Sequence, residues 1–319
     1  MTATVVGSIA FDTVTTPAGR RERMLGGAAT HFALAASLFD PVRVVGPVGE
    51  DFGEAELDVL RLRGTDVGDV EHVPGGETFF WAGAYGADLN TRTTLETRLN
   101  VFEHFAPKLS AASRACDVLF LANIVPALQL EVRQQCEGAR FVALDSMDLW
   151  IDIARDALLE VIAAVDCVIL NDSELRQLTG QAGLVAAARE VLTLGPSVVV
   201  AKQGEYGATL VSADDWFAVP AYPVAHVVDP TGAGDTFAGG FVGYLARHTG
   251  GPLTAEVLRT AMAYGTALAS FNVEEFGTGR VQRVTLAEVA ERVEELRRAT
   301  CFEHVGYAHD AHPVEVAPS

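Results

Sequence analysis

Short apolar runs alternate with longer, alanine-rich segments along most of the chain. The runs are rich in β-branched residues and lie at 4–6, 42–45, 118–122, 141–144, 167–170 and 197–201. Segments of helical length lie between many of them, at 28–39, 53–63, 128–136, 154–163, 173–178 and 184–194, and three more follow at 236–247, 255–271 and 286–298. Strands that are apolar on both faces predict a parallel sheet covered by helices on both sides, which is an α/β fold.

Two polar excursions interrupt this alternation. The longer one, at 70–105, contains Phe79, Phe80 and Trp81 and continues into a stretch rich in threonine and arginine. It predicts antiparallel strands added to the α/β core, with Phe79 and Trp81 on one face and Phe80 on the other. The shorter excursion, at 12–24, predicts a hairpin, and the two together predict one small lid.

Composition narrows the classes of partner. The chain has 319 residues, is 49% hydrophobic and carries a net charge of -19, with Lys108 and Lys202 as its lysines. Such an acidic chain is not expected to bind nucleic acid or an anionic membrane. No apolar stretch approaches the ~20 residues that span a bilayer, and no signal peptide is recognisable, so a cytoplasmic protein is expected. The four cysteines are widely spread and predict neither disulfides nor a thiolate metal site.

The most informative stretch, at 228–243, is a glycine-broken turn that leads into an apolar helix. It contains the motif Asp229-Pro-Thr-Gly-Ala-Gly-Asp235. The free N–H groups at the start of a helix, together with the helix dipole, favour an anion. Asp235 is therefore either a helix cap or a base beside a bound phosphate.

Three other polar motifs follow predicted strands: Gly7–Asp12, Asn171–Glu174 and Lys202–Gly207. Ligands of open α/β sheets bind at the carboxyl ends of the strands. Each motif alone has an ordinary explanation, because Asn-x-x-Glu is usually a capping box and Gly-x-x-Gly is usually a turn. Their common position at strand ends favours one shared site.

Together these motifs resemble the ribokinase-like (PfkB) carbohydrate and nucleoside kinase family. The stretches that fit, in order, are Gly7–Asp12, 25–28, 45–51, Asn171–Glu174, Lys202–Gly207 and Asp229–Asp235, and the resemblance covers about residues 3–298. It implies a three-layer αβα sandwich with a mostly parallel, Rossmann-like sheet and a small β-sheet lid. The kinase domain would span 1–302, with lid segments at about 12–24 and 70–105, and a loosely ordered tail would follow at 303–319.

The resemblance also implies the reaction, which is ATP-dependent phosphorylation of a hydroxymethyl group. Asp235 would take the proton of the substrate hydroxyl, and the N–H groups of Gly232, Ala233 and Gly234 would form an anion hole. The motif lacks a Walker A lysine and a protein-kinase catalytic loop, so those kinase classes are not expected.

Cofactor sites follow from the same resemblance. Asn171 and Glu174 would organise Mg²⁺ and phosphate, mostly through water. Lys202, Gly204 and Gly277 would contact the nucleotide, and Asp229 matches a residue of a monovalent-cation loop, which suits K⁺.

For the substrate, Asp12 would accept hydrogen bonds from sugar hydroxyls, and Gly26 and Gly27 would let the backbone approach the ring. His31 stands where the family usually has an asparagine that bonds the sugar. It would either donate a hydrogen bond to a sugar hydroxyl or be a helix histidine whose partners lie within the protein, so the chain departs from a simple ribose pocket. The aromatic face of Phe79 and Trp81 would either cover an apolar or aromatic part of the substrate, such as a nucleoside base, or pack the lid onto the core or onto a second subunit.

A sugar kinase is the leading hypothesis, with a sugar or nucleoside and ATP as small-molecule partners and a homodimer through the lid as an option. The alternative within the class is a nucleoside kinase that phosphorylates a 5′-hydroxyl. A sensor that kept the fold without the reaction is disfavoured by the intact Asp235 turn, and the Gly-Ser-Ile-Ala-Phe-Asp sequence after the first strand disfavours a dinucleotide-binding dehydrogenase.

Overall fold

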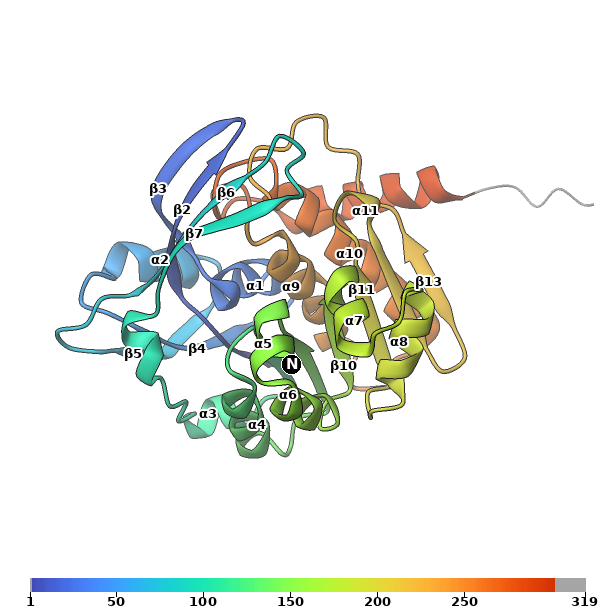
Figure 1. Cartoon of the computed structure of the whole chain (residues 1–319), viewed down its shortest axis with the longest axis horizontal. Coiled ribbons are helices and arrows are strands. Elements are labelled where there is room, and N and C mark those ends of the chain that lie inside the picture. Colours follow the sequence, from blue (N-terminus) through green and yellow to red (C-terminus); the bar gives the residue numbers. More distant parts are fainter. Residues whose placement is uncertain (1, 302–319) are drawn as a thin grey trace, which may run out of the picture.

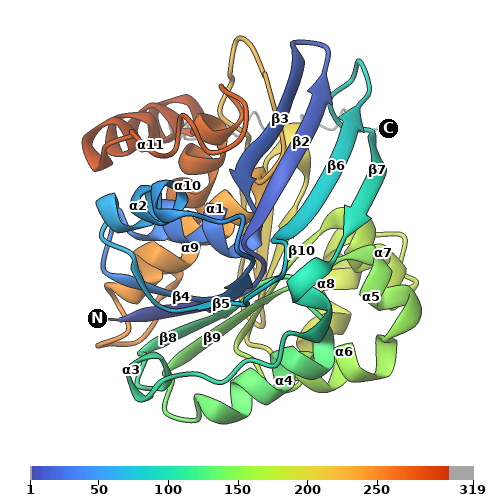
Figure 2. The same ribbon diagram turned by 90° about the vertical axis from the view of Figure 1, so that its left-hand side faces the viewer.

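The computed structural model describes residues 2–301, and the predicted tail at 303–319 lies outside this range. A nine-stranded sheet lies between two layers of helices, and a second, four-stranded sheet rises from one end of it (Figures 1 and 2). The predicted α/β sandwich with a small β lid is confirmed. Among the described residues, no helix is long and apolar enough to cross a membrane.

The large sheet has the strand order β13-β12-β11-β10-β9-β8-β1-β4-β5. Its strands are β1 (Ala3–Val6), β4 (Val42–Val48), β5 (Asp66–His72), β8 (Val118–Leu121), β9 (Phe141–Asp145), β10 (Cys167–Asn171), β11 (Val198–Lys202), β12 (Ala208–Ser212) and β13 (Trp216–Val219). All neighbours pair in parallel except β11–β12 and β12–β13, which are antiparallel. The sequence pattern did not predict the edge strands β5 and β13 or the strand β12 beside β13, and polar residues interrupt the apolar pattern in β5 and β12.

Successive residues of the central strands enter different hydrophobic cores. Val5 and Val200 belong to the core on one face, and Val6 and Val199 to the core on the other. Because side chains alternate along a strand, a strand buried on both faces must be apolar throughout. This explains the uninterrupted apolar runs of the sequence.

Helices cover both faces of the large sheet (Figure 2). On one face lie α1 (Ala28–Ala36), α2 (Glu54–Leu62), α9 (Ala233–Ala246), α10 (Ala255–Asn272) and α11 (Leu286–Thr300). On the other lie α3 (Ala111–Arg114), α4 (Pro126–Gln135), α5 (Asp148–Ile153), α6 (Arg155–Ile162), α7 (Asp172–Thr179) and α8 (Leu184–Leu192). Two short 3₁₀ helices, η1 (Asn100–His104) and η2 (Gly204–Tyr206), lie in loops between these elements.

The lid joins two hairpins that are far apart in the sequence. Its order is β3 (Gly19–Gly26), β2 (Ala10–Thr16), β6 (Phe79–Tyr85) and β7 (Arg92–Arg98). The hairpins are antiparallel, and β2 pairs with β6 in parallel. In this register Asp12 lies directly beside Trp81, so the two side chains share one face of the lid.

Helix α9 is placed by close backbone contacts on two sides. A Cβ atom on Gly239 would lie 2.4 Å from the carbonyl oxygen of Phe32 in α1, and one on Gly240 would lie 2.9 Å from the Cα atom of Gly265 in α10. Glycine therefore lets α9 lie deep between its neighbours. The start of α9, which carries Asp235, inherits its position from this packing.

We expect Gly239→Ala to destabilise the protein by at least about 2 kcal/mol, because the added methyl group must push a backbone apart. Chemical denaturation measures this change. Gly138→Ala is the matched control, since a Cβ atom there would meet nothing within 4 Å. An equal effect of the two substitutions would show that the α1–α9 contact is not tight.

Candidate active site

The turn before α9 presents backbone N–H groups to a cleft beneath the lid. Gly232 adopts a left-handed conformation with φ of 74°, which favours glycine, and the helix begins at Ala233. The first N–H groups of a helix have no partners inside the helix. Ala233 already donates its N–H to the carbonyl oxygen of Pro230 at 3.2 Å, so this predicted donor is used within the turn. Gly232 and Gly234 are the other predicted donors.

A buried hydrogen-bond network supports this turn from behind. Asn272 donates its amide N–H to the carbonyl oxygen of Thr231 at 2.8 Å, and its Oδ1 accepts from the hydroxyl of Thr236 at 3.0 Å. The same Oδ1 lies 3.0 Å from Nδ1 of His31, which therefore carries the proton. A Cβ atom on Gly232 would lie 2.3 Å from the His31 ring, so the turn rests directly on it.

His31 is a neutral residue inside the protein in this arrangement. His31 is only 1% exposed, and burial lowers the pKa of its imidazole to about 4. The structure thus places His31 beneath the anion-binding turn, where it supports Gly232. The predicted hydrogen bond from His31 to a sugar hydroxyl stays a prediction.

Asp235 lies in the first turn of α9 and faces other charged groups. Burial raises its pKa to about 7, and the carboxylate of Asp145 adds to the shift, while the Lys202 ammonium opposes it. A carboxyl group with a pKa near neutrality is suited to accept a proton at physiological pH.

Lys202 lies next to the turn at the end of β11. Its Nζ donates to Oδ2 of Asp145 at 2.7 Å, and it lies 3.3 Å from the position that a Cβ atom on Gly234 would take. Burial alone would lower the pKa of Lys202, but Asp145 and Glu174 raise it, so the ammonium stays charged. A cation therefore lies within reach of an anion bound at the turn.

Asn171 and Glu174 form a capping box at the start of α7. The Glu174 N–H donates to Oδ1 of Asn171, and the Asn171 N–H donates to Oε2 of Glu174, both at 2.7 Å. Burial raises the pKa of Glu174 to about 7, and Lys202 opposes this shift. The described residues contain no cluster of three metal-binding side chains. The carboxyl group of Glu174 suits a Mg²⁺ ion that keeps most of its water shell and is held mainly by nucleotide phosphates.

Asp12 brings the lid to the same site. Burial raises its pKa to about 7, with further increases from Asp229 and Asp235, while a backbone hydrogen bond from Gly27 lowers it. A Cβ atom on Gly26 would lie 2.0 Å from Oδ2 of Asp12, so only glycine leaves room for the carboxyl group. Asp12, Gly26 and Gly27 are thus brought together, and Asp12 lies close enough to Asp235 for their charges to interact.

Asp229 ties two loops together. Its Oδ1 accepts from the N–H of Thr231 and its Oδ2 from the N–H of Gly277, each at 2.9 Å. Burial raises the pKa of Asp229. Gly277 lies against Met24 of the lid and does not line the pocket on the other side of the turn. The cation role of Asp229 and the nucleotide role of Gly277 stay predictions.

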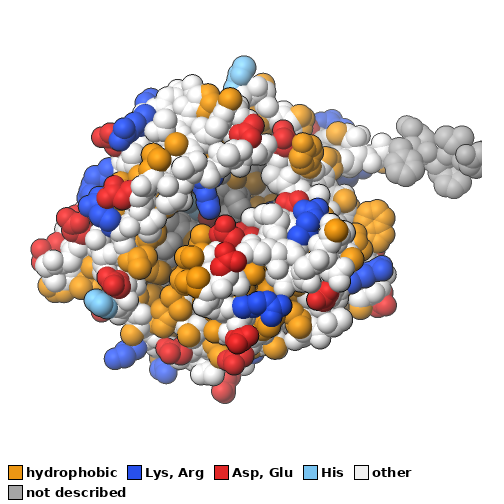
Figure 3. Space-filling view, viewed as in Figure 1, with side chains coloured by type: hydrophobic (Ala, Val, Ile, Leu, Met, Phe, Trp, Pro, Cys, Tyr) orange, Lys and Arg blue, Asp and Glu red, His pale blue; other side chains and the backbone are white. Residues whose placement is uncertain are grey.

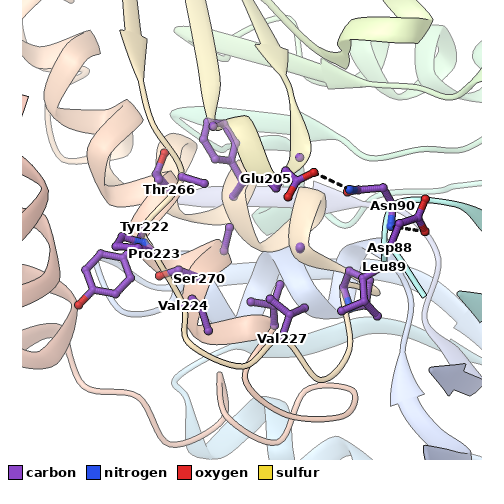
Figure 4. A pocket seen from close by; sticks show the side chains of 18 residues that line it. Asp88, Leu89, Asn90, Glu205, Tyr222, Pro223, Val224, Val227, Thr266 and Ser270 are labelled. Atoms are coloured by element: carbon purple, nitrogen blue, oxygen red, sulfur yellow. Dashed lines mark hydrogen bonds between the residues drawn. The ribbon is translucent and has the colours of Figure 1, made fainter. Parts of the chain in front are cut away.

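A pocket of about 500 Å³ opens on the other side of the turn. Pro230 and Ala233 lie at the turn, and Gly204 and Glu205 border the pocket near β11. Its far end is mostly apolar and lies between the loop before α9 and helix α10 (Figure 4), with Tyr222, Pro223, Val224, Val227, Phe237, Thr266, Ala269, Ser270 and Val273 as lining residues. The space-filling view shows the hollow beneath the lid, with both acidic and basic side chains around it (Figure 3).

Sequence reasoning missed several residues of this site. Asp145 ends strand β9 and could have been found by the same strand-end argument that selected Asn171 and Lys202. Asn272 and Tyr85 carried no local signal, because their partners in the turn lie 41 and 146 positions away.

Comparison with known protein families shows to which family this chain belongs. A family model described as pfkB family carbohydrate kinase matches residues 3–284. The chain belongs to this family. It is therefore a kinase, and the predicted general activity, phosphorylation of a sugar or a nucleoside, is confirmed.

The relatives of this kinase are named as kinases of different substrates. It is 32% identical over 251 residues to a cytidine kinase of Thermococcus kodakarensis, covering 76% of this chain and 88% of the relative. It is 29% identical over 245 residues to a 2-dehydro-3-deoxygluconokinase of Thermoproteus tenax, covering 69% and 73%. The solved structure of a nucleoside kinase from Methanocaldococcus jannaschii, a member of the ribokinase family, has the same fold, with a TM-score of 0.74, 21% identity and coverage of 92% and 98%.

The raised pKa of Asp235 makes the stability of this kinase depend on pH. Folding favours the protonated carboxyl group, so its contribution to stability is complete below the ordinary pKa of 3.8 and is lost as the pH rises towards about 7. Asparagine cannot ionise. We expect Asp235→Asn to be about 1 to 2 kcal/mol more stable than the wild type at pH 8, with a smaller difference at pH 5. Denaturation at both pH values measures this, and a difference that does not depend on pH would contradict the burial of the charge.

Proposed function

We propose that this kinase transfers the γ-phosphate of ATP to a hydroxymethyl group of a sugar, with Asp235 as the base. The observation that carries the proposal is the position of Asp235, at the start of α9 between Asp12 of the lid and the Lys202 ammonium. The substrate oxygen forms a bond to phosphorus, the bond between phosphorus and ADP breaks, and the hydroxyl proton passes to Asp235.

The remaining groups stabilise charge in this reaction. The turn N–H groups and Lys202 face the phosphoryl group as negative charge builds up on it. Mg²⁺, bound with ATP, would neutralise part of the phosphate charge, and Glu174 is the carboxylate placed to hold its water shell. Asp145 fixes the Lys202 ammonium beside Gly234, so it is a positioning residue.

The pocket beyond the turn would receive the nucleoside part of ATP. Its far end offers apolar side chains for a flat base, and its near end reaches the anion-binding turn at Ala233. In this proposal the triphosphate would lie between the pocket and Asp235, and the acceptor between Asp235 and Asp12. The two substrates would thus meet at the start of α9, as in-line transfer requires.

One observation favours a nucleoside as the acceptor. A Cβ atom on Gly83 would lie 2.1 Å from the indole ring of Trp81, so the ring extends over this glycine on the Asp12 face of the lid. The indole Nε1 donates to the hydroxyl of Thr94 at 3.3 Å, which fixes the ring. A flat aromatic surface beside the residue that would hold the sugar suits a planar base.

We expect Asp235→Asn to lower kcat by about 100- to 10,000-fold, because the base is lost while the turn and Lys202 remain. Binding of a non-hydrolysable ATP analogue should stay within about threefold of the wild type, as measured by calorimetry. In the wild type, kcat/KM should fall as the pH drops below about 7, where Asp235 becomes protonated. Near-normal turnover of the variant would rule out Asp235 as the base.

The nucleoside hypothesis is tested by a phosphorylation screen with cytidine, other nucleosides and free sugars. If a base stacks on Trp81, Trp81→Ala should raise KM for the nucleoside about tenfold and leave KM for a free sugar unchanged. Trp216→Ala is the control, because Trp216 is 61% exposed and lies on β13, an edge strand of the large sheet that is not part of the lid. Equal losses for nucleosides and sugars would show that Trp81 only supports the lid.

A further inference from the structure

The pocket beyond the turn has one wall that does not belong to the α/β core. Asp88, Leu89 and Asn90, from the turn between β6 and β7 of the lid, line it together with Gly204 and Glu205 of the core. Figure 4 shows Asn90 and Leu89 at one end of the pocket and Tyr222 and Pro223 at the other. The lid therefore reaches past the acceptor side and borders the space assigned to the nucleotide.

Two hydrogen bonds connect the lid with the core around this pocket. The amide of Asn90 donates to Oε1 of Glu205 at 2.9 Å (Figure 4). The hydroxyl of Thr231, in the anion-binding turn, donates to the hydroxyl of Tyr85 at 3.3 Å. Gly204 has a φ of 57° and lies under Asn90, whose Oδ1 would be 3.4 Å from a Cβ atom at this position. The end of β6 and the turn that follows it are thus joined to the two loops that border the pocket.

The lid turn is held together by its own hydrogen bonds. Gly86 donates its N–H to the carbonyl oxygen of Thr91 at 2.9 Å, which closes the turn. The Asp88 carboxylate accepts from the N–H groups of Asn90 and Thr91, at 3.2 and 3.0 Å, and from the Thr91 hydroxyl at 2.7 Å. These hydrogen bonds lower the pKa of Asp88, and the one from the Thr91 hydroxyl has the largest effect. The charge of Asp88 is therefore used inside the turn, which holds its neighbours in place.

Leu89 sits in this turn in an unfavourable conformation. Its φ is 56°, in the left-handed region that a side chain with a Cβ atom normally avoids, at a cost of about 1 to 2 kcal/mol. Glycine would fit the turn without strain. The leucine side chain instead extends the apolar lining of the pocket that begins at Val227 (Figure 4).

We propose that Leu89 and Asn90 of the lid are part of the nucleotide site, where Leu89 covers the bound nucleotide and Asn90 holds the lid closed through Glu205. This inference rests on the proposed function, because it takes the pocket to be the ATP site. The lid also carries Asp12, which serves the acceptor, so one sheet contacts both substrates. Each substrate then favours the same closed position of the lid, and the two affinities are linked reciprocally.

The test measures binding of a non-hydrolysable ATP analogue with Mg²⁺ by calorimetry. Asn90→Ala removes one hydrogen bond between lid and core, and we expect the analogue to bind about fivefold more weakly. Leu89→Gly removes the side chain and also the strain, so we expect weaker binding together with an unchanged or higher melting temperature. Thr93→Ala is the control, because Thr93 is exposed, pairs with Ala84 and lies on the face of the lid opposite to Tyr85. This variant should bind the ATP analogue as tightly as the wild type does.

Hydrogen exchange gives a second readout that needs no substitution. Addition of the analogue to the wild type should slow amide exchange in residues 86–91 of the lid turn. If the wild type binds the analogue, but both variants bind it equally well and exchange at 86–91 is unchanged, this inference is overturned and the proposed function stands. If the wild type does not bind the analogue at all, both are overturned.

Discussion

The site depends on one constraint, which is that a helix must begin with its backbone exposed to a cleft and yet be held rigidly from behind. Gly232 meets this constraint by resting directly on the ring of His31, without a side chain between them. Asn272 then holds the turn on both sides of Gly232 through Thr231 and Thr236. Because the histidine is buried and neutral, it adds no charge that would compete for the anion. The geometry of Asp235 follows from this support.

Charge explains why the same site is costly for the folded protein. Asp145, Glu174 and Asp235 interact with the Lys202 ammonium, and Asp12 interacts with Asp235. Burial raises the pKa of Asp12, Glu174 and Asp235 to about 7. Such a cluster is unfavourable when it is empty and fully ionised. A triphosphate with its metal ion brings the matching cation, and proton transfer needs a base with a pKa near neutrality. The unfavourable electrostatics are thus part of the mechanism that we propose.

The lid gives the kinase a way to treat its two substrates together. Its sheet presents Asp12 and Trp81 on one face, and the turn between β6 and β7 places Leu89 in the lining of the pocket assigned to ATP. A sheet is stiff across its strands because every strand is hydrogen-bonded to its neighbours. In the proposed mechanism, closure of the lid at one end would therefore move the other end and would exclude water from both sides of the reacting phosphate.

The sequence by itself determined the layers, the parallel sheet and the family, because apolar runs buried on both faces and the Asp229–Asp235 motif are local patterns. It also selected Asp235, Lys202 and Asp12, since all follow strands or open a helix. Only the tertiary structure decided that His31 lies under the turn, that Asp145 holds Lys202, and that the lid turn reaches the pocket. These facts depend on contacts between residues far apart in the chain, and such contacts leave no periodic or local trace in the sequence.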